Sequence, residues 1–114
     1  MNDINALYKI WSEKAVLDPD LQAELKSCDG KDDEILDRFY KNLEFGTGGL
    51  RGVIGAGTNR MNVYTVAQAT QGLADYLNET FSEPTVAIAY DSRIKSDMFA
   101  ESAACVLAAN GVKV

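Results

Sequence analysis

Three short apolar runs alternate with two amphipathic segments in the second half of this 114-residue chain, and this alternation restricts its fold most strongly. The runs lie at residues 50–54, 86–90 and 112–114. Between them, apolar residues recur at helical spacing over residues 62–80 and 96–110. The order strand, helix, strand, helix, strand is typical of a sheet with helices packed on it. We therefore predict an α/β fold.

The predicted helices of this half have recognisable ends. Asn62 and Ser96 stand where the two helices are expected to begin, and both residue types are good N-caps. Gly111 follows the last apolar position of the second helix and is a good C-terminal residue. The final run at residues 112–114 is expected to begin a third strand of a truncated domain. Such a strand would have an unpaired edge, and we expect self-association through it.

Residues 1–42 are predicted to form a helical extension ahead of a partial α/β domain at residues 43–114. Apolar residues occur at three-and-four spacing in three segments of the extension. Each segment begins beside an aspartate, a residue type that is favoured at helix N-termini: Asp3, Asp18 and Asp32.

Charge and composition exclude several classes of function. The net charge of −6 argues against binding nucleic acids and against docking on anionic membranes. The chain has no histidine, which excludes His-based triads and Cys/His zinc sites. Its two cysteines, Cys28 and Cys105, are too few for a disulfide framework, and we expect free, buried thiols. The polar amino terminus and the lack of a ~20-residue apolar run predict a cytoplasmic protein.

The segment Phe45–Gly52 has the composition of an anion-binding loop. Gly48 and Gly49 allow positive φ and leave backbone N–H groups uncovered, and successive N–H groups of this kind can form a nest for an anion. Arg51 adds a planar guanidinium that matches two phosphate oxygens, and Thr47 adds a hydroxyl. The glycine motifs of dinucleotide and mononucleotide sites do not fit this sequence. The alternative is an ordinary glycine loop with a surface arginine.

Read as Phe-Gly-Thr-Gly-Gly-Leu-Arg-Gly, this segment resembles the first-strand motif of the α-D-phosphohexomutase superfamily, the phosphoglucomutases and phosphomannomutases. Residues 59–62 and 89–93 follow in the order that this family shows, and the resemblance covers residues 43–114. The helical lead-in and the Gly-Thr-Gly-Gly sequence are similar to the phosphoglucomutase/phosphopentomutase-like branch. The resemblance implies the first domain of the family, a three-layer α/β/α unit with a mixed sheet, here truncated.

The resemblance also implies an activity for the parent protein. Family members are intramolecular phosphotransferases that move a phosphate between positions of a hexose or pentose phosphate. A phosphoserine donates its phosphoryl group to the sugar and takes one back from a bisphosphorylated intermediate. Mg²⁺ and a sugar bisphosphate activator assist. The serine loop and the metal loop have no counterpart in this chain, so we expect no catalytic or metal-binding residue in it and no activity of the chain alone.

The family's residue roles extend only to the positions that match. Arg51 aligns with the motif arginine that lies beside the phosphoserine and contacts phosphate, while Gly48 and Gly49 would shape that loop. Arg93 is expected to support the serine loop, and Asp91 to pair with Arg51 or Arg93. Asp91 as a simple turn residue is an equal alternative.

Two other functions stay open from the sequence. The chain can be a non-catalytic phosphate-binding module, which would bind phosphate tightly when isolated. It can also be a protein-interaction module, in which the helical stripes of residues 3–43 bind a partner. Deleting residues 1–42 and testing whether the rest folds would separate the second reading from the mutase domain.

Overall fold

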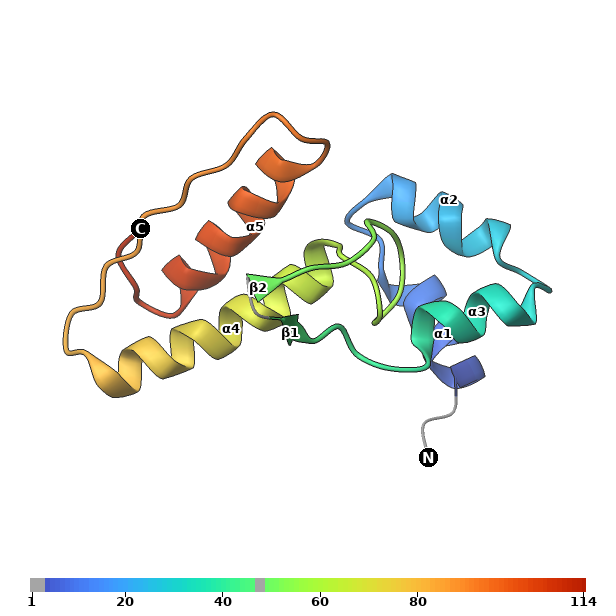
Figure 1. Cartoon of the computed structure of the whole chain (residues 1–114), viewed down its shortest axis with the longest axis horizontal. Helices are drawn as coiled ribbons and strands as arrows, with labels where there is room; N and C mark the ends of the chain where they lie inside the picture. The colour runs from blue at the N-terminus through green and yellow to red at the C-terminus, as the bar shows by residue number, and fades with distance from the viewer. Residues whose placement is uncertain (1–3, 47–48) are drawn as a thin grey trace. The chain divides into compact units, whose positions relative to one another are not determined.

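The computed structural model describes residues 4–46 and 49–114 (Figure 1). The chain divides into two compact units, one ending at Asn62 and the other beginning at Val63. In chain order, the described residues form α1 (Ile4–Lys14), α2 (Pro19–Ser27), α3 (Asp32–Phe39), β1 (Phe45–Gly46), β2 (Gly49–Leu50), α4 (Val63–Thr80) and α5 (Ser96–Ala109). Among these helices, none has both the length and the hydropathy needed to cross a membrane.

The first unit is built around Phe39, at the end of α3. The rings of Tyr8 and Trp11 in α1 meet Phe39 edge-on, with centroid distances of 6.2 and 5.7 Å. Leu21 and Leu25 of α2 are also fully buried. The helices begin where the sequence predicts: Asp18 accepts a hydrogen bond from the Asp20 N–H, and α3 begins at Asp32. The predicted helical stripes thus bury one another.

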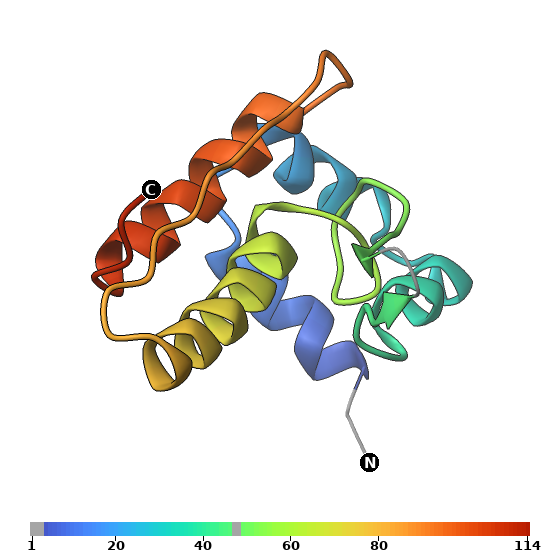
Figure 2. The ribbon, with the colours of Figure 1, turned by 60° about the vertical axis from the view of Figure 1, so that its left-hand side comes forward.

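The second unit is a helix pair with an extended segment. Ala74 of α4, Leu107 of α5 and Val112 form its buried core, and Val86 and Ile88 pack against them. Figures 1 and 2 show the chain between α4 and α5 running back alongside α5. The predicted helix ends are partly confirmed. Helix α4 begins directly after Asn62, and Gly111 adopts a positive φ of 77° after α5.

The start of α5 and the state of one cysteine differ from the predictions. The N-cap of α5 is Lys95, which has a left-handed φ of 65°, so the predicted cap at Ser96 is wrong by one residue. Ser96 instead donates its hydroxyl hydrogen bond to Asp91 Oδ1 at 2.9 Å. Cys28 is buried as expected, whereas Cys105 is exposed on α5, because it lies outside the stripe that Leu107 buries.

The described residues do not form the predicted mixed sheet. Their strand pairing is confined to β1 and β2, which are antiparallel with Phe45 opposite Leu50, and to two isolated parallel bridges. One bridge joins Ile54 to Met61 and the other joins Thr85 to Lys113.

The physical reason lies in what each apolar run meets. At the run 86–90, the Val86 N–H donates to the Lys113 carbonyl, and the Lys113 N–H donates to the Pro84 carbonyl. Val86 and Ile88 are half-buried, whereas Ala87 and Ala89 are exposed, so the run is covered on one face and not on both as predicted. A parallel strand needs a neighbour along its length, and a single bridge does not supply one.

Candidate functional site

The chain after α3 forms a glycine-rich loop at residues 43–58, and hydrogen bonds join the two ends of this loop. The Leu43 N–H donates to the Thr58 carbonyl at 2.9 Å, and the Thr58 hydroxyl donates to the Lys41 carbonyl at 2.8 Å. One residue later, the Asn59 N–H donates to the carbonyl of Arg38, also at 2.9 Å. The chain therefore runs out through β1, returns through β2 and closes on the helix that it left.

The returning half of this loop folds around the side chain of Asn62. Asn62 is 1 % exposed, and its amide nitrogen donates to the carbonyls of Gly55 and Gly57 at 2.8 and 3.0 Å. The backbone also pairs with itself, since the Met61 N–H donates to Val53 and the Gly55 N–H donates to Met61. Nearly all backbone groups buried in proteins are paired, and here one buried amide satisfies two carbonyls.

A partly buried ion pair between α2 and α3 holds the same turn. Arg38 Nη1 lies 2.8 Å from Glu24 Oε2 and donates to the Ala56 carbonyl at 3.0 Å. The same Glu24 oxygen accepts the Ala56 N–H at 2.8 Å. A Cβ on Gly55 would lie 2.9 Å from Glu24 Oε2, so a side chain at this position would have to displace the Glu24 carboxylate.

The start of the loop carries the predicted anion-binding residues. Gly49 has a φ of 109°, and an added Cβ would meet nothing within 4 Å. This conformation is the positive φ that the sequence predicts. Thr47 and Gly48 lie outside the described residues.

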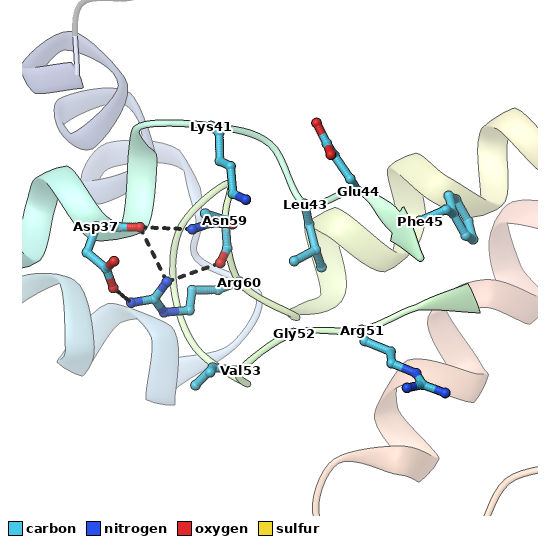
Figure 3. A pocket seen from close by; sticks show the side chains of 10 residues that line it. All are labelled: Asp37, Lys41, Leu43, Glu44, Phe45, Arg51, Gly52, Val53, Asn59 and Arg60. Carbon is cyan, nitrogen blue, oxygen red and sulfur yellow. Dashed lines mark hydrogen bonds and ion pairs between the residues drawn. The ribbon is translucent and has the colours of Figure 1, made fainter. Parts of the chain in front are cut away.

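Beside this segment lies an open hollow of about 540 Å³ (Figure 3). Five charged residues line it: Asp37, Lys41, Glu44, Arg51 and Arg60. Arg60 is engaged, since its guanidinium pairs with the Asp37 carboxylate. Figure 3 shows the Arg51 side chain extending away from that pair.

Arg51 is exposed, and within residues 4–46 and 49–114 it makes no hydrogen bond or ion pair. Lys41 is exposed as well, and its amine lies 5.6 Å from the centroid of the Tyr40 ring. Among the described residues, the hollow thus has two cations outside any ion pair, Lys41 and Arg51, against one such acid, Glu44. A local excess of positive charge in a chain of net charge −6 suits an anion.

The predicted supporting residues lie in the second unit. Of the two partners predicted for Asp91, the structure pairs it with Arg93, whose Nε lies 2.8 Å from the carboxylate. The Arg93 N–H also donates to Asp91 at 3.0 Å. Backbone and side-chain hydrogen bonds from Arg93, with one from Ser96, lower the Asp91 pKa from 3.8 to about 2. Asp91 is thus also the turn residue of the alternative prediction.

Several residues that organise the loop were not predicted from the sequence. No sequence pattern singles out Lys41, Glu24 or Arg38, and Asn62 is predicted only to cap a helix. The available signal was glycine at 55 and 57, which marks a close backbone approach without identifying the approaching group. No group of three His, Cys, Asp or Glu side chains that could hold a metal occurs in the part of the chain that the structure describes.

Comparison with known proteins adds independent information. Residues 42–114 match the family model described as phosphoglucomutase/phosphomannomutase, alpha/beta/alpha domain I. A phosphoglucomutase of Staphylococcus epidermidis is 36 % identical over 96 residues, which cover 73 % of this chain and 18 % of that protein. A phosphoglucomutase of Staphylococcus aureus is 44 % identical over 78 residues, or 68 % of this chain and 14 % of the relative.

The chain therefore spans less than a fifth of the length of these curated relatives. No solved structure matches it.

Proposed function

Since the chain belongs to the phosphoglucomutase/phosphomannomutase family through its alpha/beta/alpha domain I at residues 42–114, we propose that it supplies the phosphate-facing loop of a phosphosugar mutase. The parent enzyme would be an intramolecular phosphotransferase acting on a hexose or pentose phosphate through a phosphoserine. Residues 43–114 would form part of its first domain, and residues 1–42 a helical extension of that domain.

The observation that carries this proposal is the state of Arg51. Its guanidinium is exposed and unpaired among the described residues, while the loop that carries it is closed by hydrogen bonds at both ends. A free guanidinium on a held backbone can donate two parallel hydrogen bonds to a phosphate at little ordering cost. Arg60, by contrast, is already neutralised by Asp37.

The chemistry that the chain can perform is binding and orientation. We propose that Arg51 holds two phosphate oxygens, that Gly48 and Gly49 shape the loop beside them, and that Thr47 adds a hydroxyl. Arg93 and Asp91 would support a neighbouring loop. A phosphoryl transfer also needs a nucleophile and a clamp for the transferring group, and we assign neither to this chain.

The family is in general Mg²⁺-dependent, and we propose that Mg²⁺ and a sugar bisphosphate activator act in the parent enzyme. The residues in hand do not fit the metal, because no acidic cluster of the required size occurs among those described. We therefore assign no metal ligand here and derive no step through the ion.

The proposal is tested by titrating the chain with three solutes and following its amide NMR signals. Inorganic phosphate and glucose 1-phosphate should both shift the signals of residues 49–53, because they share the group that Arg51 recognises. Glucose should leave those signals in place. Equal shifts with glucose, or none with either phosphate, would overturn the proposal.

A conversion assay separates the mutase reading from its alternatives. Supplied with glucose 1-phosphate and the bisphosphate activator, the chain alone should form no glucose 6-phosphate. Measurable turnover would contradict the assignment of the nucleophile to other residues. Tight phosphate binding by the chain alone would favour the non-catalytic binding module, since one side of a cleft makes few of the contacts.

A further inference from the structure

The ion pair between Glu24 and Arg38 lies outside the segment that matches the family domain, yet it bonds to the loop inside it. The match begins at residue 42, whereas Glu24 is in α2 and Arg38 is in α3. Both side chains bond to Ala56, one to its N–H and the other to its carbonyl. The helical extension therefore contributes polar side chains to the backbone of the neighbouring domain segment.

The pair is shielded from solvent on the arginine side. The Arg38 side chain is 16 % exposed and that of Glu24 is 36 % exposed. Arg38 Nε is buried and has no hydrogen-bond partner among the described residues. Removing one member of such a pair leaves the other charge and the Ala56 backbone groups without their partners, which is a local and specific cost.

A chain of short contacts leads from Ala56 to Arg51. Gly55, next to Ala56, pairs with Met61, and Met61 pairs with Val53, two residues after Arg51. The residue between Val53 and Arg51 is Gly52, where an added Cβ would lie 2.6 Å from a methyl group of Leu43. Arg51 thus lies two residues before a hydrogen-bonded position of the backbone.

We infer that Glu24 and Arg38 are positioning residues for Arg51, and that the helical extension thereby sets the affinity of the loop for a phosphate group. They act through Ala56 and touch no ligand themselves. The inference rests on the proposed function for the identity of the ligand. Its structural part, that the pair holds the loop, stands on the contacts alone.

Native-state hydrogen exchange tests the structural part with matched variants. In Glu24→Ala, the amides of residues 53–61 should exchange faster through local opening, at rates that added denaturant does not change. Glu24→Gln should restore much of the protection, because its amide oxygen can still accept the Ala56 N–H. Glu34→Ala is the control, because Glu34 also lies in α3 and, among the described residues, its carboxylate accepts a hydrogen bond only from Cys28 Sγ.

Phosphate affinity tests the functional part. The Arg51 Nε–H signal is followed while inorganic phosphate is added to each chain. If the competent loop population falls to about a fifth in Glu24→Ala, the apparent dissociation constant rises about fivefold. Glu24→Gln and Glu34→Ala should stay near the value of the unsubstituted chain. A purely structural pair would lower stability without this difference between Ala and Gln.

Each outcome decides one claim. Unchanged loop exchange in Glu24→Ala, or faster exchange with unchanged phosphate affinity, overturns the inference. If Glu24→Ala does not fold, Glu24→Gln and Arg38→Lys replace it. Loop exchange and phosphate affinity that stay native in Arg38→Lys but change in Arg38→Gln support the inference. Equal behaviour of Arg38→Lys and Arg38→Gln overturns it. Absence of any phosphate shift in the unsubstituted chain would remove the proposed function, and the exchange rates would still decide whether the pair holds the loop.

Discussion

The backbone of Gly57 lies so close to Arg38 that a Cβ on Gly57 would stand 2.5 Å from the Arg38 carbonyl oxygen. Gly57 also has a φ of 128°, a conformation that side chains rarely adopt. We expect Gly57→Ala to destabilise the first unit by about 2 kcal/mol or more, from backbone strain together with the clash. Urea unfolding compared with the unsubstituted chain measures the loss.

Gly72 provides the matched control for this substitution. It lies inside α4, and an added Cβ would meet nothing within 4 Å. Gly72→Ala should therefore stabilise the helix by up to about 1 kcal/mol, because alanine loses less backbone entropy there. Similar changes in stability for the two substitutions would contradict the close approach at Gly57.

The two cysteines should differ in reactivity. Cys28 is 1 % exposed, and its pKa is raised above 9.0, mainly because burial disfavours the thiolate. Cys105 is exposed on α5. We expect a thiol reagent at mildly alkaline pH to modify Cys105 in the folded chain and Cys28 only after unfolding, as mass spectrometry of peptides would show. Equal rates at both thiols under native conditions would contradict the burial of Cys28.

The Asp91 turn should be sensitive to acid. Its folded-state pKa of about 2 lies below the ordinary value of 3.8, so its contribution to stability is complete above pH 3.8. That contribution is lost as the pH falls from 3.8 towards 2, where the carboxylate takes up a proton and releases Arg93 and Ser96. NMR titration of the Asp91 carboxyl carbon measures the midpoint, and a value at or above 3.8 would refute the hydrogen bonds.

The helices of this chain were predictable from the sequence because their signals are local. Three-and-four spacing, Asp18 before Pro19, and Gly111 after α5 each act within one or two turns. The miss at Lys95 is of one residue, and it arises because the Ser96 hydroxyl bonds to Asp91 and not to the helix backbone. Helix ends depend on such side-chain choices, which spacing does not record.

The sheet could not be predicted in the same way, because strand pairing depends on neighbours that lie elsewhere. An apolar run such as 86–90 has strand composition, but it becomes a strand only beside another one, and here it has one bridge to Lys113. The loop likewise combines a feature that is local in sequence with contacts that are not. Its positive φ at Gly49 follows from residue type, whereas the Glu24–Arg38–Ala56 contacts join residues up to 32 positions apart.

The central claim is that Arg51 recognises phosphate, and a single titration tests it most directly. The chain, Arg51→Ala and Lys9→Ala, which removes an exposed charge on α1, are each titrated with inorganic phosphate and followed by amide NMR. Losing a charge-assisted hydrogen bond of about 1.5–3 kcal/mol weakens binding roughly ten- to a hundredfold, so the shifts near the loop should vanish in Arg51→Ala alone. Folded stability should not change, because the guanidinium is exposed. Equal loss of the shifts in both variants, or their survival in Arg51→Ala, would contradict the account.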